Sequence, residues 1–95
     1  MTQQYIVGEF SALLAGLYPA SDELLCDAVR DLRHQVEFSP LSTLPRLAHE
    51  TLHLTDTICW AALEHGDQAG FCRCAGAAVA LRDFGVDAGL MASEA

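Results

Sequence analysis

The fold of this chain is decided by one stretch, residues 44–67, which reads LPRLAHETLHLTDTICWAALEHGD. Apolar and small side chains return in it every three or four residues, which is the spacing of one face of an α-helix. We therefore predict a helix over about Leu44–His65, with Pro45 in its first turn and Ser42 or Thr43 as its N-cap. The predicted core face carries Leu44, Leu47, Ala48, Thr51, Leu54, Thr55, Ile58, Cys59 and Ala62.

The two residues that follow this helix, Gly66 and Asp67, predict a tight turn. Glycine tolerates the left-handed conformation that ends many helices, and aspartate is a good N-cap for the next one. A connection this short makes the two helices antiparallel. The next helix is predicted over about Gln68–Phe84, and because it is apolar nearly all round, we expect it to be buried on several sides. A frayed tail is expected at about 89–95.

Two more helices are predicted before residue 44. The first covers about Gln3–Leu17, with Thr2 as its N-cap. The second covers about Asp22–Phe38, with Ser21 as its N-cap, and it ends before Pro40 because the residue preceding a proline avoids helical angles. Their apolar stripes are Ile6, Phe10, Leu13, Leu14 and Leu17 in the first helix and Leu25, Ala28, Val29, Leu32 and Val36 in the second.

The fold class follows from these four segments. No stretch alternates apolar and polar residues with the period of two that is typical of a half-buried strand. Sequential amphipathic helices joined by short loops predict an all-α fold, an antiparallel (up-down) four-helix bundle, with residues 1–95 as one domain. The alternative is a three-helix core with a short extra N-terminal helix.

The charge of the chain argues against two classes of partner. The formal net charge is −8, because five arginines stand against thirteen acidic residues. Nucleic-acid binding and attraction to an anionic membrane both depend on a basic face. We therefore expect no nucleic acid and no membrane as partner, and a helix-turn-helix DNA binder is a disfavoured alternative.

The cellular location is inferred from composition and from the cysteines. No segment has the pattern of a signal peptide, and no apolar run reaches the ~18 residues that span a bilayer. The chain contains neither lysine nor asparagine, which indicates a GC-rich, bacterial genome. We expect a cytoplasmic protein whose thiols are reduced. The cysteines are Cys26, Cys59, Cys72 and Cys74, and those of the fourth helix are interpreted as small core residues.

One pentapeptide, His49-Glu50-Thr51-Leu52-His53, matches the H-E-x-x-H pattern. Histidines four residues apart share a helix face and can bind one zinc ion, and the glutamate can act as general base. The pentapeptide resembles the zinc site of the zincin metallopeptidases. That resemblance implies His49 and His53 as ligands and Glu50 as the base.

The residues around this pentapeptide depart from those families. A catalytic zinc needs a third protein ligand, and the extended motif would place glycine and histidine where this chain has Asp56 and Cys59. A variant of these families takes its third ligand, a glutamate, from a later helix. Glu64 lies on the same predicted helix as the two histidines, so it cannot fold back to a zinc ion that they hold. His49, His53 and Asp56 all lie opposite the predicted core face, so we interpret them as part of a solvated polar face. A zinc site made of these three residues is the alternative.

Trp60 is the residue that most resembles an interface anchor. It is the only tryptophan, and on the predicted helix it lies away from the core face, flanked by Leu52 and Leu63. Tryptophan is enriched at binding hot spots. In the alternative interpretation the first helix or the tail packs over Trp60 and makes it part of the core.

These observations predict a non-enzymatic helical protein-interaction or regulatory module. The apolar fourth helix together with Trp60, Leu52 and Leu63 is more apolar surface than one small bundle easily hides, which favours a homodimer. We expect the partner to be a protein, either a second copy or another protein, and no cofactor. The alternative function is a small zinc-binding protein or metal-dependent hydrolase that uses residues 49–53.

Overall fold

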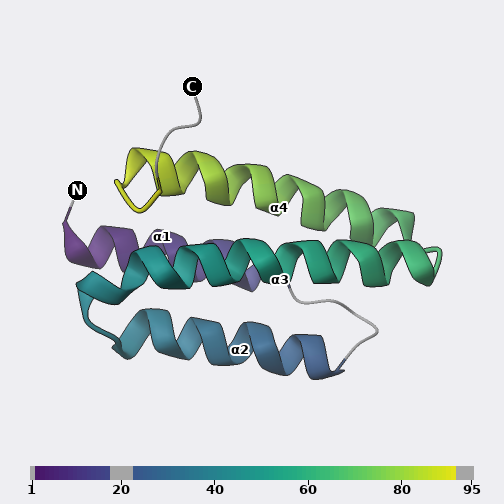
Figure 1. Cartoon of the computed structure of the whole chain (residues 1–95), viewed down its shortest axis with the longest axis horizontal. Helices are drawn as coiled ribbons and strands as arrows, with labels where there is room; N and C mark the ends of the chain where they lie inside the picture. The colour runs from purple at the N-terminus through teal and green to yellow at the C-terminus, as the bar shows by residue number, and fades with distance from the viewer. Residues whose placement is uncertain (1, 18–22, 92–95) are drawn as a thin grey trace.

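Four α-helices follow one another along the chain in the predicted order (Figure 1). The structure is a computed structural model, and it describes residues 2–17 and 23–91. The helices are α1 (Gln3–Ala15), α2 (Glu23–Phe38), α3 (Leu44–Glu64) and α4 (Gln68–Asp87), and a short 3-10 turn, η1 (Leu41–Thr43), precedes α3. The described ranges contain no strand, and the expected all-α four-helix bundle is confirmed.

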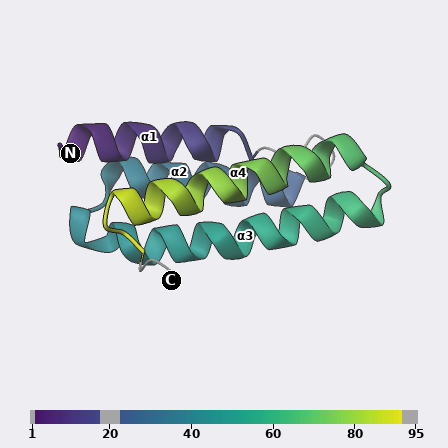
Figure 2. The same ribbon diagram turned by 90° about the horizontal axis from the view of Figure 1, so that it is seen from above.

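The helices alternate in direction and close into a ring (Figures 1 and 2). Helices α1 and α3 lie on opposite sides of the bundle, and α2 and α4 occupy the two positions between them. Each helix packs against its neighbours in the chain, and α4 returns to α1. The α3–α4 interface is the most extensive and the α1–α4 interface the least, so α4 is held mainly by α3.

The core contains most of the predicted stripes, but Leu54, Cys59 and Ala62 of the predicted α3 face are only partly buried, because they lie at the edge of that face. Phe10 and Leu14 of α1 are fully buried, as are Val29 and Val36 of α2. Helix α3 adds a continuous buried face, because its core positions repeat at helical spacing. That face consists of Leu44, Leu47, Ala48, Thr51, Thr55 and Ile58.

Two threonines, Thr51 and Thr55, are buried in this core, and the hydroxyl of each has a hydrogen-bond partner. The Thr51 hydroxyl donates to the carbonyl oxygen of Leu47 at 2.7 Å, and the Thr55 hydroxyl donates to that of Leu52 at 2.6 Å. A buried hydroxyl costs little when it has a hydrogen-bond partner, which explains why threonine is tolerated at these core positions.

The turn between α3 and α4 is built as the sequence predicts. Gly66 has a φ of +70°, and its N–H donates to the carbonyl of Leu63 at 3.1 Å. The N–H of Asp67 donates to the carbonyl of Ala62 at 2.8 Å, which completes a Schellman motif. The carboxylate of Asp67 then accepts from the N–H of Gly70 at 2.9 Å and caps α4. The short antiparallel hairpin is therefore confirmed.

Helix caps and ends agree with the sequence in part. Thr2 caps α1 by accepting from the N–H of Tyr5, as predicted. Thr43 is the N-cap residue of α3, as predicted, but its hydroxyl does not cap the helix, because it donates to the carbonyl of Pro40 within the η1 turn, which also contains Ser42. Helix α1 ends at Ala15, two residues before the predicted end, and α4 continues to Asp87. The predicted cap Ser21 lies outside the described residues.

The prediction that α4 is buried on several sides is wrong. Its buried residues lie along one line and are Gly70, Cys74, Leu81 and Gly85. Cys72 and Val79 are exposed. The reason is topological, because α4 packs extensively against α3 alone and only slightly against α1.

The chain after α4 turns back onto the bundle. Gly89 has a φ of +74°, and the N–H of Leu90 donates to the carbonyl of Gly85 at 2.7 Å. Leu90 is buried, so the first part of the tail predicted at about 89–95 packs on the core. Residues 92–95 of that tail lie outside the described residues.

Within the described ranges, none of the helices combines the length and the apolar character that crossing a lipid bilayer requires.

Candidate functional site

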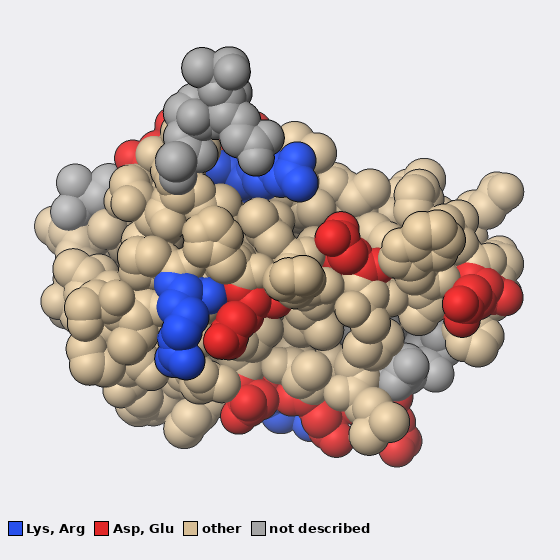
Figure 3. Space-filling view, in the orientation of Figure 1, with Lys and Arg blue, Asp and Glu red and all other residues tan. Residues whose placement is uncertain are grey.

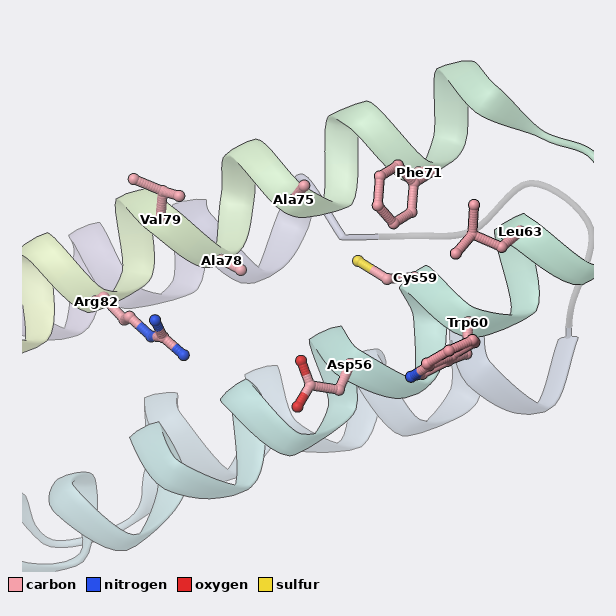
Figure 4. A pocket seen from close by; sticks show the side chains of 9 residues that line it. All are labelled: Asp56, Cys59, Trp60, Leu63, Phe71, Ala75, Ala78, Val79 and Arg82. Atoms are coloured by element: carbon pink, nitrogen blue, oxygen red, sulfur yellow. The ribbon is translucent and has the colours of Figure 1, made fainter.

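A groove with a volume of about 420 Å³ runs between α3 and α4 (Figure 4). We call it the Trp60 groove. Its α3 wall consists of Asp56, Cys59, Trp60 and Leu63. Its α4 wall consists of Phe71, Ala75, Ala78, Val79 and Arg82.

The groove is rimmed by large apolar side chains that the rest of the described bundle leaves exposed. Trp60 is 67% exposed, Leu63 is 49% exposed and Val79 is 62% exposed. Neither α1 nor residues 89–91 of the tail seal the indole, which was the alternative left open by the sequence. Single exposed apolar residues are common, whereas several around one concavity mark an interaction site.

Helical spacing explains both walls. On α3, Trp60 comes two residues after the buried Ile58, so it points to nearly the opposite side of the helix. On α4 the wall residues recur at intervals of three and four, which places them on one face. Ala75 and Ala78 are small and leave room on the α4 wall between Phe71 and Arg82 (Figure 4).

The structure unites some of the residues that the sequence singled out and separates others. Trp60 and Leu63 meet in the groove, together with Asp56. Leu52 does not line it, because its side chain is half-buried and packs against the core cluster. The α4 wall was not predicted, since a helix that is apolar nearly all round does not reveal which side stays uncovered.

Two opposite charges lie within this otherwise apolar surface. Asp56 on α3 and Arg82 on α4 both direct their side chains into the groove (Figure 4). In the part of the chain that the structure describes, the ion pairs are Arg30–Asp27 and Arg46–Glu50. Each joins two exposed side chains of the same helix. Neither Asp56 nor Arg82 takes part in them. Each wall of the groove therefore presents one charge that is open to a partner.

The H-E-x-x-H residues lie on the exposed side of α3. His49 and His53 are exposed, and Glu50 is paired with Arg46 at 3.7 Å. Among the residues of known placement, no three His, Cys, Asp or Glu side chains converge as a metal site requires. The threonine at the centre of the pattern, Thr51, belongs to the core.

The thiols differ strongly in their surroundings. All four cysteines are free. Cys74 is buried, and its thiol donates to the carbonyl of Thr55 at 3.3 Å. Burial, followed by a hydrogen bond with Cys59, raises the pKa of Cys74 to about 12. The interpretation as a core residue is confirmed for Cys74 and wrong for Cys72, which is exposed because α4 is covered on one side only.

A second, smaller depression of about 290 Å³ lies along α2 and is polar. Its lining residues are Arg30, Arg33, His34 and Glu37. Two of them are used in packing, since the Ser11 hydroxyl of α1 donates to Glu37 at 2.9 Å and accepts from Arg33 at 3.3 Å. We assign this surface to the α1–α2 interface.

Comparisons of this chain with protein-family models, with curated proteins and with solved structures find no match. The chemistry of the Trp60 groove is therefore the basis on which a function can be proposed.

Proposed function

We propose that this chain is a non-enzymatic helical protein-interaction module and that the Trp60 groove is its contact surface. The observation that carries the proposal is the exposure of Trp60, Leu63 and Val79 around one groove. Hot spots of protein interfaces are enriched in tryptophan that a partner covers completely. The groove has the form of such a site before its partner is bound.

The energy available at the groove supports this proposal. About two thirds of Trp60 is exposed to water. Covering this exposed area of ~150 Å² would contribute roughly 4 kcal/mol at about 25 cal/mol per Å². Leu63 and Val79 together add an amount of similar size. Covering these groups would therefore offset a substantial part of the free energy that association costs.

The chemistry of the groove supports a binding role more than a catalytic one. Its ionisable side chains are Asp56, Cys59 and Arg82. Nucleophilic catalysis needs a nucleophile within hydrogen-bond reach of a base, and the described groove residues contain no such bonded pair. The zinc-dependent alternative has less support, because His49 and His53 are exposed and no third ligand joins them.

The location of the module is part of the proposal. Four free thiols, one of them exposed at Cys72, fit a reducing compartment. We propose that the protein acts in the cytoplasm of a bacterial cell.

A photo-crosslinking amino acid introduced at position 60 tests the proposal in the cells that express the protein. We expect crosslinked protein adducts from position 60 that mass spectrometry can identify. Position 38 is the matched control, because Phe38 is 73% exposed but lies at the C-terminal end of α2, next to the start of α3, whereas Trp60 lies about 24 Å further along α3. Equal adduct formation at both positions, or none at position 60, would contradict the proposal.

A further inference from the structure

We propose that the occupant of the Trp60 groove is a second copy of this chain, related to the first by a two-fold axis that runs along the groove. This inference rests on the function proposed above and names its partner. Such an axis exchanges the two walls, so that α3 of each copy lies over α4 of the other. Asp56 of one copy then faces the helix that carries Arg82 of its partner.

The charges of the groove are the first reason for this choice. Asp56 lies on one wall and Arg82 on the other, and neither belongs to the ion pairs of the described residues. A surface with one charge of each sign on opposite walls is complementary to itself when the walls are exchanged. A two-fold axis across the helices would instead place α3 over α3 and bring the two Asp56 carboxylates to the same side. The observed arrangement therefore favours the axis along the groove.

The two alanines of the α4 wall are the second reason. Large residues stand on both walls, Trp60 and Leu63 on α3 and Phe71 and Val79 on α4, and the small Ala75 and Ala78 lie between the last two. Close packing requires large residues opposite small ones. The alanines therefore make the part of the groove that a side chain of the second copy can fill.

The direction of the helices agrees with this arrangement. Helices α3 and α4 are antiparallel within one copy, and a two-fold axis along them leaves their directions unchanged (Figure 1). Helix α3 of one copy therefore runs antiparallel to α4 of the other. The interface becomes a second antiparallel four-helix arrangement, the kind of packing already used inside the bundle.

The charge around the groove weakens the expected association. The formal net charge of each chain is −8, which by itself opposes self-association. On the face shown in Figure 3 acidic groups lie along the lower edge, where α2 lies, and separate acidic and basic groups lie over α3 and α4 with uncharged surface between them. Within the groove the charges of Asp56 and Arg82 cancel.

The size of the face sets the expected strength. From Phe71 to Arg82 it extends about 17 Å along α4, and two adjacent helices are about 20 Å wide. A flat face of that size buries about 700 Å² over both copies, which is below the ~1,200 Å² of stable interfaces and in the range of weak, transient ones. We therefore expect a weak dimer with a dissociation constant in the upper micromolar range.

Charge reversal tests the inference with the purified full chain. Sedimentation from about 1 to about 300 µM should show the wild type passing from monomer to dimer. Asp56→Arg and Arg82→Asp should each weaken the dimer at least tenfold, since like charges then meet across the interface. The double variant Asp56→Arg/Arg82→Asp should recover most of the loss, because the pairs are restored with reversed sign. Glu9→Arg makes the same charge change as Asp56→Arg at an exposed position of α1. It should leave the dissociation constant within about twofold of the wild-type value.

The single tryptophan supplies an independent readout. Trp60 is exposed in the monomer, so its emission should shift to shorter wavelength, and quenching by iodide should fall, over the concentrations at which the dimer forms. A dimer without this change, or a double variant as weak as the single ones, would overturn the inference. A monomer at every concentration would also overturn it. In that case adducts to a different protein from position 60 would leave the proposed interaction module standing.

Discussion

At the scale of single residues, the two cysteines of α4 are close in the sequence but differ in burial. Cys72 and Cys74 are two residues apart and therefore point to nearly opposite sides of the helix. Cys74 faces α3 and bonds to the carbonyl of Thr55, whereas Cys72 faces solvent. Their chemistry should differ accordingly.

We expect iodoacetamide at pH 8 to alkylate Cys72 at least about tenfold faster than Cys74, because only an accessible thiolate reacts. The pKa of Cys74 is about 12, so its thiolate is scarce at that pH. Trypsin cleaves after Arg73 and separates the two cysteines. Because the Cys72 peptide also contains Cys59, fragment ions in tandem mass spectrometry assign the label to one of them. Labelling in concentrated guanidinium chloride should remove the difference. Equal rates in the folded protein would show that Cys74 is not buried as described.

The raised pKa of Cys74 also predicts how stability depends on pH. Burial raises the pKa of this thiol from 9.0 to about 12, so above pH 9 the unfolded chain loses a proton that the folded chain retains. The free energy of unfolding should therefore fall as the pH rises from 9 toward 12, and below pH 9 the thiol contributes no pH dependence. Urea unfolding at pH 8 and pH 10 measures the effect. Cys74→Ala should reduce the difference between the two pH values, and Cys72→Ala should preserve it.

At the scale of elements, the α3–α4 hairpin depends on a glycine in the left-handed conformation. Gly66 has a φ of +70°, where a side chain is strained. Gly76 lies within α4, is exposed and has open space where a Cβ would be. The two glycines therefore make a matched pair for the same substitution.

We expect Gly66→Ala to destabilise the protein by about 1–2 kcal/mol, since a residue with a Cβ pays that amount in the left-handed region. Gly76→Ala should stabilise it by about 0.5–1 kcal/mol, because alanine loses less conformational entropy in a helix. Urea unfolding of both variants measures the signs. Loss of stability in both variants would mean that the helix around Gly76 is packed more tightly than described.

At the scale of the whole molecule, the ring of four helices is closed by its weakest interface, between α1 and α4. Phe10 and Phe84 meet there edge to face, with ring centroids 6.1 Å apart and planes at 74°. Phe10 is fully buried, and Phe84 packs against the same core. This aromatic pair should hold α4 in place at its C-terminal half.

Phe10→Ala should lower the free energy of unfolding by about 3–5 kcal/mol, as for other buried aromatic residues. That is a large part of the 5–15 kcal/mol typical of a small domain. Phe38→Ala is the control, because Phe38 is 73% exposed and should cost less than about 1 kcal/mol. Circular dichroism in urea compares the three proteins, and similar losses in both variants would contradict the assigned core.

Much of the fold and part of the candidate site could be predicted from the sequence. The spacing of Leu44, Leu47 and Thr51 identified the core face of α3, and Gly66-Asp67 identified the turn that makes α3 and α4 a hairpin. These features depend on residues close together in the chain. Trp60 could be placed off the core face for the same reason.

The sequence by itself determined the helices, their ends near glycine and proline, and the side of α3 that carries Trp60. The tertiary structure alone decided which side of α4 remains uncovered, and so that Val79 and Arg82 form a wall opposite Asp56 and Trp60. The physical reason is that helix formation depends on neighbours within a few residues, whereas exposure depends on which distant helix covers a face. Helix α1 covers only part of α4, and a pattern that is apolar all round contains no record of that.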